Sequence, residues 1–408
     1  MFVLLMEFLR TKFGLFSPFL MNYSTRMILA AITSWVICIF AGPYFIKKLY
    51  ELKIGQSIRL EECPLLGKLH QKKQNTPTMG GILILFSMII SLFLWMDPSH
   101  VFTLILLVST LILGILGGTD DYLKLRYRNT KGLSARYKLL GQVLFSALLA
   151  IYFFSPNAAS HLQIGEWFSP PIIKESNINY LTDGQTKIEQ VVLPLYEYAG
   201  RIYIPFFKDP VFVFSGSLAI LGAIFIIFVI TGSSNAVNLT DGLDGLAAGC
   251  LILVASSLAL IAFVSNHIDL ATYLNVLYIE GSGEIAIYLS AFVGACLGFL
   301  WYNGHPAQLF MGDTGSLALG GILGVSAVLL RKEMLLGLVG GIFVAEALSV
   351  ILQVGSYKLR NKKRIFLCAP LHHHFEYKGW AETKVVIRFW IIGLLLALIG
   401  IASLKIVI

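Results

Sequence analysis

Five aspartates lie at the ends of apolar segments in a chain that otherwise carries few charges. Asp120 and Asp121 close one such segment, Asp241 and Asp244 open another, and Asp313 lies between two more. An ionised carboxylate at the centre of a bilayer costs about 2.5–3.5 kcal/mol on insertion scales, so acids retained at such positions indicate a function. The neighbouring residues are glycine, asparagine, threonine and lysine, which suit phosphate groups. The pattern predicts a site for a metal ion and phosphate at one membrane face.

Asp120 and Asp121 are adjacent, so on a helix their side chains point about 100° apart. Lys124 follows Asp120 at i, i+4 and shares its face. One carboxylate could therefore address a metal ion or a proton while the other positions a partner group. A solvated helix end explains the same three residues equally well.

Asp241 and Asp244 are three residues apart and share a face if the segment is helical. Asn235 and Asn238 precede them, and the whole cluster is expected at a helix N-terminus. Helix capping explains one acid at such a place. Because it does not explain two acids and two asparagines, substrate binding is the favoured interpretation.

Asp313 lies in the segment Gly312-Asp313-Thr314-Gly315. The glycines permit close backbone approach, and the helix that follows offers free amides to phosphate. A carboxylate there repels phosphate unless a cation lies between them. Mg²⁺ is bound by one or two carboxylates together with phosphate oxygens, so Asp313 is the predicted metal ligand and Mg²⁺ the predicted cofactor.

Three consecutive histidines, His372, His373 and His374, occur in a basic segment. Adjacent side chains cannot easily face one zinc ion, and no cysteine or aspartate beside them completes a tetrahedron. Binding of phosphate oxygens fits these imidazoles better; a solvated loop is the alternative. His70 and Lys73 add further donors and positive charge on the same side of the membrane.

The composition is that of a polytopic helical membrane protein. Hydrophobic residues make up 57% of the chain, charged residues only 13%, and the mean hydropathy is +0.77. The apolar segments are continuous, whereas a barrel has alternating ones. In such a protein the net charge of +8 reports orientation and not nucleic-acid binding. No disulfide framework or zinc site is expected from the scattered cysteines Cys38, Cys63, Cys250, Cys296 and Cys368.

A membrane-spanning helix needs about 20 mostly apolar residues. The sequence predicts a single all-α integral membrane domain over 1–408, with ten transmembrane helices and both ends on the same side. Residues 1–25 form an expected interfacial lead-in, and 156–210 an extended loop that folds as a hairpin or small cap. The predicted spans are 26–46, 79–97, 101–118, 137–155, 211–231, 244–265, 283–302, 314–331, 334–356 and 386–407.

Lysine and arginine set the expected orientation, because cytoplasmic loops carry an excess of both. Both termini and the 156–210 loop are then periplasmic, and all five aspartates lie on the cytoplasmic face. The basic segments are Lys47, Lys48, Lys53, Arg59, Lys68, Lys72 and Lys73; Lys124, Arg126, Arg128, Lys131 and Arg136; and Lys358, Arg360, Lys362, Lys363, Arg364, Lys378 and Lys384.

Carboxylates for a divalent metal, lysine and histidine for phosphate, and a membrane location together predict one reaction class. Phosphoryl transfer to a lipid-linked acceptor uses all three, because its barrier is lowered mainly by positioning and by charge neutralisation.

Five long motifs resemble those of the phospho-N-acetylmuramoyl-pentapeptide transferase family, within the polyprenyl-phosphate N-acetylhexosamine-1-phosphate transferases (glycosyltransferase family 4). The resemblance covers the chain apart from 156–210, and a ten-span fold agrees with it. The motifs are TPTMGG at 76–81, GGTDDYLK at 117–124, NAVNLTDGLDGLA at 235–247, NGHPAQLFMGDTGSLALGG at 303–321 and APLHHHFEYKGW at 369–380.

The resemblance implies a reaction in the bacterial inner membrane, with the active site facing the cytoplasm. Phospho-MurNAc-pentapeptide passes from UDP-MurNAc-pentapeptide to undecaprenyl phosphate, giving lipid I and UMP, with Mg²⁺. Direct attack by the lipid phosphate is favoured over a covalent aspartyl intermediate. Homodimers are a further expectation from the family.

The resemblance also implies residue roles. Asp313 matches a metal ligand, Asp120 a residue that deprotonates or positions the lipid phosphate, and Asp121 a second essential acid; His372 completes the expected catalytic set. The expected substrate-binding residues are Lys73, Thr78, Lys124, Asn235, Asn238, Asp241, Asp244, Asn303, Phe310, Gln353, His373 and His374.

Two other functions remain as alternatives. A sister enzyme that uses UDP-GlcNAc shares the aspartates, although the PLHHHFE segment resembles the muramoyl type. An ion-coupled transporter also carries intramembrane acids. The acids here lie at one face, however, and no inverted repeat is visible.

Overall fold

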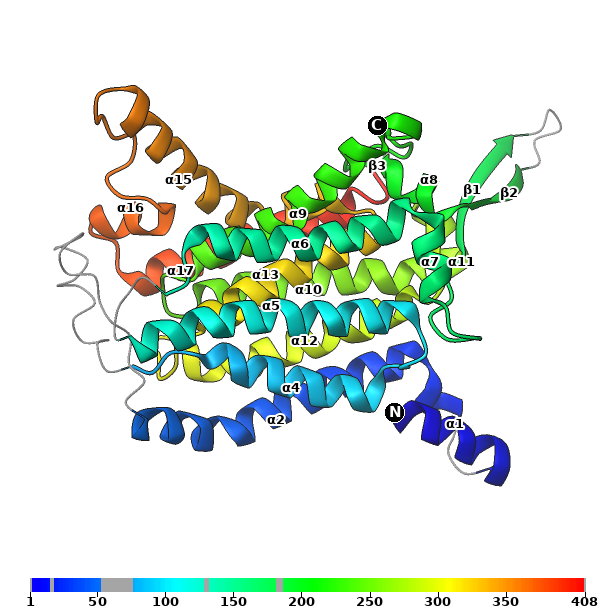
Figure 1. The fold of residues 1–408 in the computed structure, drawn as a ribbon, viewed down its shortest axis with the longest axis horizontal. Helices are drawn as coiled ribbons and strands as arrows, with labels where there is room; N and C mark the ends of the chain where they lie inside the picture. The colour runs from blue at the N-terminus through cyan, green and yellow to red at the C-terminus, as the bar shows by residue number, and fades with distance from the viewer. Residues whose placement is uncertain (1, 15–17, 53–75, 128–131, 181–185, 407–408) are drawn as a thin grey trace.

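The structure, a computed structural model, describes residues 2–14, 18–52, 76–127, 132–180 and 186–406. Most of them form a bundle of long helices that run in roughly the same direction (Figure 1). Nine helices in this part of the chain are long and apolar enough to cross a membrane, so the chain is a multi-pass membrane protein. They are α2 (Tyr23–Glu51), α5 (Val101–Arg126), α6 (Ala135–Phe154), α9 (Ala219–Thr240), α10 (Leu246–Ser265), α12 (Ser282–Asn303), α13 (Gly312–Leu329), α15 (Gly341–Leu359) and α17 (Glu382–Ala402).

Three predicted spans differ from the helices observed. The segment 79–97 is α4 (Gly80–Trp95), an apolar helix of only 16 residues. The segment 334–356 is divided at Gly340 into α14 (Glu333–Val339) and α15. The segment 211–231 was placed too early, because the polar residues that follow it continue α9 as far as Thr240. The total of ten spans stays a prediction.

Helix α13 is the centre of the bundle. Nearly all of its residues are buried, and it packs against α4, α5, α9 and α10. Helix α12 packs in the same layer against α2, α4 and α10. Helix α15 contacts α9 and then leans away from the bundle (Figure 1). Residues at the N-terminus of α13 are therefore surrounded by the ends of several other helices.

The two ends of the bundle carry different structures (Figure 1). One end carries the short α16 (Leu371–Tyr377). At the other, β1 (Ile173–Tyr180) and β2 (Thr186–Leu193) form the hairpin expected within 156–210, and β1 also pairs with β5 (Tyr278–Ile279). The same end also holds the carboxyl end of α17 and several short elements. These are α1 (Phe2–Phe13), η1 (Pro18–Met21), α7 (Pro156–Leu162), α8 (Leu195–Gly200), β3 (Arg201–Ile202), β4 (Phe212–Val213), η3 (Gly216–Leu218) and α11 (Ile268–Tyr273).

A buried ion pair joins three elements at the hairpin end. The guanidinium of Arg26 on α2 lies 2.7 Å from the carboxylate of Glu284 on α12. Arg26 also donates to the carbonyl of Trp95, and Glu284 accepts the amide of Asp97. A buried pair is stable only when its remaining polar atoms are also bonded, as they are here. This glutamate therefore has a structural role.

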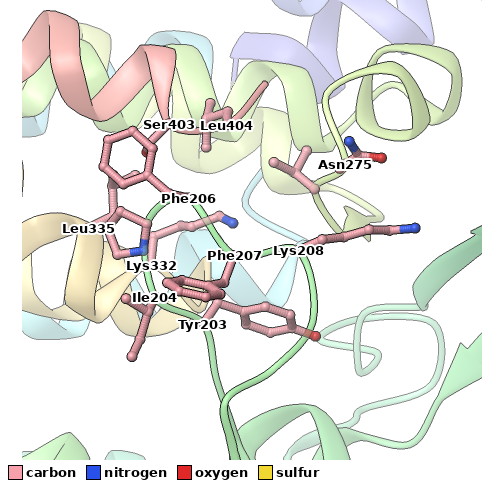
Figure 2. A pocket seen from close by; sticks show the side chains of 12 residues that line it. Tyr203, Ile204, Phe206, Phe207, Lys208, Asn275, Lys332, Leu335, Ser403 and Leu404 are labelled. Atoms are coloured by element: carbon pink, nitrogen blue, oxygen red, sulfur yellow. The ribbon is translucent and has the colours of Figure 1, made fainter. Parts of the chain in front are cut away.

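A small pocket also lies at the hairpin end (Figure 2). It opens between the loop after β3 and the carboxyl end of α17, and its lining has lysines but no acid. This pocket lacks the carboxylates that predicted the chemistry. Its lining includes Tyr203, Phe206, Lys208, Lys332, Ser403 and Leu404.

The described cysteines form no disulfide with one another. Cys38, Cys250, Cys296 and Cys368 are all free thiols, and the first three are buried. Cys63 lies outside the described residues.

The TMGG motif brings α4 against α13 at backbone distance. Gly81 donates its amide to the carbonyl of Met311 at 2.8 Å, and Gly80 donates to Phe310 at the same distance. A Cβ on Gly81 would overlap the backbone nitrogen of Gly315. Only glycine permits this contact, which fixes the N-terminus of α13.

We expect Gly81→Ala to lower the free energy of unfolding by about 1–3 kcal/mol, because the added methyl group overpacks this contact. Thermal unfolding in detergent measures the effect. Gly355→Ala on α15 is the matched control, because a Cβ there meets nothing within 4 Å. Equal stability of the two variants would contradict the role given to Gly81.

Candidate active site

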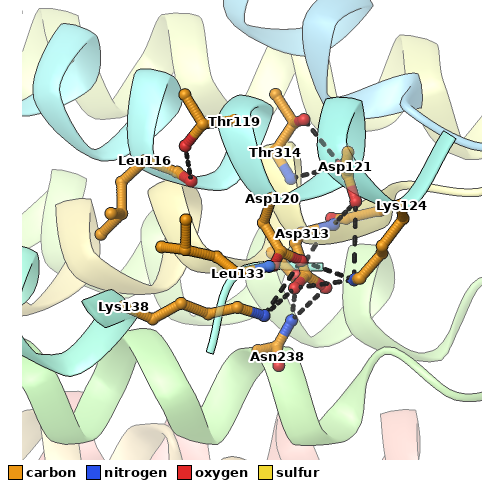
Figure 3. Close-up of polar contacts among 12 residues, drawn as sticks. Leu116, Thr119, Asp120, Asp121, Lys124, Leu133, Lys138, Asn238, Asp313 and Thr314 are labelled. Carbon is orange, nitrogen blue, oxygen red and sulfur yellow. Dashed lines mark hydrogen bonds and ion pairs between the residues drawn. The ribbon is translucent and has the colours of Figure 1, made fainter. Parts of the chain in front are cut away.

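Three of the five aspartates meet where α5 ends and α13 begins (Figure 3). Asp120 and Asp121 lie in the last turns of α5, and Asp313 in the first turn of α13. One carboxylate oxygen from each lies within 4.8 Å of the others. The side chains of Asp120 and Asp121 are buried, and that of Asp313 is 14% exposed. We call these three residues the carboxylate cluster.

Glycines allow the two helices to approach closely enough for this cluster to form. A Cβ on Gly117 would overlap the carbonyl oxygen of Asp313. Gly312 has a positive φ of 74°, and a Cβ there would lie 2.7 Å from a carboxylate oxygen of Asp121. Glycine is the residue that adopts this backbone conformation without strain. The GDTG segment therefore positions its aspartate as the sequence suggested.

Asp121 caps the N-terminus of α13. Its carboxylate accepts the amides of Asp313 at 3.2 Å and Thr314 at 2.8 Å, and the Thr314 hydroxyl at 2.7 Å. These bonds satisfy amides that lack partners within the helix, and the negative charge suits the positive end of the helix dipole. Asp121 thus holds Asp313 in place, while Asp120 and Asp313 face the lysines.

Two lysines neutralise the carboxylate cluster (Figure 3). The ammonium of Lys124 lies 2.6 Å from Asp120 and 3.0 Å from Asp313. The ammonium of Lys138, on α6, lies 2.9 Å from Asp120 and 2.7 Å from Asp313. Lys124 was expected in the site. Lys138 was missed, although a lysine inside the predicted span 137–155 was itself a signal.

Asn238 also belongs to this group, because it donates to Asp313 at 2.9 Å and to Ser316 at 2.8 Å. Asn235 points elsewhere and donates to Gln142 of α6 at 2.8 Å. Both asparagines lie on the last turns of α9. The helix expected after the cluster is α10 (Leu246–Ser265), but the two asparagines belong to the preceding helix, because the burial of this polar segment between α6 and α13 keeps it helical.

Asp241 and Asp244 lie in the turn between α9 and α10, not on one helical face. Burial raises the pKa of Asp241 to about 7, and the negative charges of Asp313 and Asp121 add to this shift. Part of the surface of Asp241 remains accessible. The raised pKa reflects how close this carboxyl group lies to the carboxylate cluster.

Asp244 and Asn303 fasten this turn to the loop that follows α12. Asp244 accepts the amide of Ala307 at 3.1 Å and lies 3.0 Å from Nδ1 of His305. Asn303 accepts the amide of Gly245 and donates to the carbonyl of Leu309. Asp244, His305 and Glu382 also present ligand atoms within 4.8 Å of one another.

Thr78 lies beside the carboxylate cluster, close to Gly312. Phe310 donates its amide to Pro77 and continues the contact between α4 and α13. Gln353 is engaged with the connection between α15 and α16, where it bonds to the backbone of Ile365 and Phe366 at 3.0 Å. His70 and Lys73 lie outside the described residues.

The three histidines of α16 have three different partners. The buried His372 lies 3.2 Å from Glu346, and His373 lies 2.7 Å from Glu376. His374 accepts the amide of Leu367 at Nδ1. Partial burial and the charge of Lys378 lower the pKa of His374, which favours the neutral ring that this bond requires. The separate partners agree with the expectation that the three rings do not share one metal.

The carboxylate cluster suits a hard divalent cation. Its ligands are all oxygen, the donor type that Mg²⁺ takes. With every group charged, three carboxylates and two ammonium groups sum to −1, and a divalent cation brings the sum to +1, which suits an anionic phosphate. The lysines can in turn neutralise phosphate. This arrangement is suited to the transfer of phosphate groups.

Comparisons with known proteins support this interpretation. The profile of glycosyl transferase family 4 matches residues 184–331, and signature 1 of the phospho-N-acetylmuramoyl-pentapeptide-transferases matches residues 73–85. The chain is 71% identical over 385 residues to the phospho-N-acetylmuramoyl-pentapeptide-transferase of Protochlamydia amoebophila, with 94% of each chain covered. The chain belongs to the phospho-N-acetylmuramoyl-pentapeptide-transferase family.

Other members of this family are more distant but match over nearly the full length. The protein of Endomicrobium trichonymphae is 45% identical, with 96% of this chain and 97% of the relative covered. That of Koribacter versatilis is 44% identical, with 96% of each covered. Membership of the phospho-N-acetylmuramoyl-pentapeptide-transferase family confirms the resemblance of the motifs and identifies the chain as a transferase.

We expect Lys138→Met to destabilise the fold by about 1–3 kcal/mol, because it leaves buried carboxylates without one of their two ammonium partners. Added Mg²⁺ should restore more of the melting temperature in this variant than in the wild type, since the cation replaces the lost charge. Thermal unfolding with and without Mg²⁺ measures both effects. Lys138→Arg keeps the charge and serves as the control. A variant that melts and responds to Mg²⁺ like the wild type would contradict the proposed charge balance.

Proposed function

We propose that this protein transfers phospho-MurNAc-pentapeptide from UDP-MurNAc-pentapeptide to undecaprenyl phosphate, forming lipid I and UMP. An oxygen of the lipid phosphate attacks the sugar-linked phosphorus, the bond from that phosphorus to UMP breaks, and UMP leaves with the electron pair. The observation that carries this proposal is the carboxylate cluster with its two lysines, in a chain 71% identical to a phospho-N-acetylmuramoyl-pentapeptide-transferase.

Asp120 and Asp313 have different proposed roles within the carboxylate cluster. Asp120 is the residue proposed to position or deprotonate the lipid phosphate, and its buried side chain is oriented by the amide of Leu133 at 2.6 Å. Asp313 is the proposed metal ligand, held by Asn238 and by the capping contact of Asp121. Because these contacts are preorganised, little rearrangement is needed when substrate charge arrives.

Mg²⁺ is the proposed cofactor, held by Asp313 with the neighbouring carboxylates. When bound, it neutralises charge on the diphosphate. The protein's own contribution is to bring phosphate beside the ammonium groups of Lys124 and Lys138. Both lysines lie on the open side of Asp313, the most exposed of the three acids.

The nucleotide-sugar is proposed to bind along the turn after α9 and along α16. The ring of His372 packs against Gly242, the residue after Asp241, since a Cβ at Gly242 would overlap that ring. His373, His374, Thr78 and Phe310 are further proposed contacts of the nucleotide-sugar. Asn235, Asp244, Asn303 and Gln353 support this side through the backbone and side-chain bonds described above.

The proposed location is the bacterial inner membrane, with this site on the cytoplasmic face. The site lies at the end of the bundle opposite the hairpin (Figure 1). Among the described residues, that end carries basic side chains in the last turns of α2 and α5 and after α15, and cytoplasmic loops are enriched in lysine and arginine. These residues are Lys47, Lys48, Lys124, Arg126, Arg360, Lys362, Lys363 and Arg364. Both substrates can reach such a site, one from the cytosol and the other from the membrane.

We expect Asp313→Asn to lower the rate of transfer by about 10²–10³-fold or more, because the amide is a poorer metal ligand and cannot balance the two lysines. UMP release measures the rate, and thermal unfolding shows whether the variant is folded. Asp269→Asn, on the exposed face of α11 at the hairpin end, is the control. A folded Asp313→Asn variant with near-normal turnover would remove this residue from the metal site.

The substrate is tested by incubating purified protein with undecaprenyl phosphate, Mg²⁺ and either UDP-MurNAc-pentapeptide or UDP-GlcNAc. We expect UMP release with the first sugar nucleotide only, and loss of that release when EDTA removes the metal. Release with UDP-GlcNAc alone would instead assign the chain to the sister reaction.

A further inference from the structure

Glu346 is a buried glutamate that the chemistry above does not use. It lies on α15, a helix apolar enough to cross a membrane, and its side chain is fully buried. An acid in such a helix is costly and is retained when a specific partner needs it. Its partner here is His372, the first histidine of α16.

The carboxylate of Glu346 holds both the backbone and the ring of His372. It accepts the amide of His372 at 3.1 Å, and its second oxygen lies 3.2 Å from the ring nitrogen Nδ1. The backbone contact places the start of α16 against α15. In this structure Nδ1 lies near the carboxylate without forming a hydrogen bond, and Nε2 lies on the other edge of the ring.

The other ring nitrogen lies against the turn after α9. Like Nδ1, Nε2 of His372 is buried and has no hydrogen-bond partner among the described residues. It lies against Gly242, beside Asp241 and so next to the carboxylate cluster. A buried polar atom without a partner carries a free-energy cost that a bound group can relieve.

We propose that Glu346 is a positioning residue that orients His372 and sets its tautomer for the transfer reaction. The short distance lets Nδ1–H donate to the carboxylate after a small rotation of the ring, which fixes the direction of Nε2. A carboxylate that holds a histidine in this way acts through the ring and not on the substrate. This inference rests on the proposed function, which places His372 on the nucleotide-sugar side, and on the expectation that His372 is catalytic.

Glu346→Gln separates this role from a purely structural one. Glutamine has nearly the same shape, and its oxygen can still accept the amide of His372. Its NH₂ group can only donate to Nδ1, however, which moves the ring proton to Nε2 and reverses the tautomer. We expect kcat to fall by about 100-fold, while KM for UDP-MurNAc-pentapeptide changes by less than about threefold.

A double-mutant cycle supplies the decisive comparison. If Glu346 acts through His372, Glu346→Gln should reduce kcat by less than about threefold further in a His372→Gln background. A merely structural glutamate would cause the same proportional loss in both backgrounds. Glu346→Asp retains the charge and should recover part of the activity that Glu346→Gln loses.

Glu284→Gln is the matched control, because it removes another buried, membrane-embedded glutamate at the opposite end of the bundle. We expect it to lower the melting temperature and to leave turnover per folded molecule unchanged. Wild-type kcat in a folded Glu346→Gln variant would overturn the inference, as would equal losses in both backgrounds. A wild-type protein that releases no UMP would overturn the proposed function itself, which keeps the two failures distinct.

Discussion

The structure depends on the neutralisation of three carboxylates held together inside a helix bundle. Like charges within 4.8 Å of one another in a largely buried place repel strongly. Three positively charged groups offset this repulsion. The N-terminus of α13 faces Asp121, and the ammonium groups of Lys124 on α5 and Lys138 on α6 lie between Asp120 and Asp313. Each of the three groups belongs to a different helix. The helices α5, α6 and α13 therefore have to pack together for the carboxylates of the site to be neutralised.

Close backbone approach is what allows these helices to meet that requirement. Gly81, Gly117 and Gly312 each lie where a side chain would strike the neighbouring backbone or the carboxylate of Asp121. Small residues let membrane helices pack at short distance, where van der Waals contact replaces a hydrophobic driving force. The sequence motifs that contain the aspartates therefore also contain the glycines that allow the helices to pack closely. Their glycines determine where the acids can be.

The sequence was sufficient for the fold class, most helix positions and the residues of the carboxylate cluster, because apolar length and costly charges are local signals. It failed where a role depends on a distant partner. Lys138 is a helix residue whose partners are 18 and 175 positions away. The carboxyl end of α9 is polar and stays helical only because α6 and α13 bury it. The backbone contacts of Asn303 and Gln353 could not be seen from residue type.

The two lysines fit the proposed function, in which the site holds a metal ion and phosphate in turn. An ammonium group bound to a carboxylate is stable while the site holds neither cation nor phosphate. In the proposed reaction, a divalent cation bound by Asp313 takes over part of that neutralising charge, which leaves the lysines able to turn toward phosphate. The flexible stem of lysine permits such an exchange, whereas the planar fork of arginine favours a fixed pair. Fixed arginine pairs are found instead at the hairpin end, where Arg26 holds Glu284 and no exchange is needed. At these two sites the basic residue thus matches whether its partner has to change in the proposed reaction.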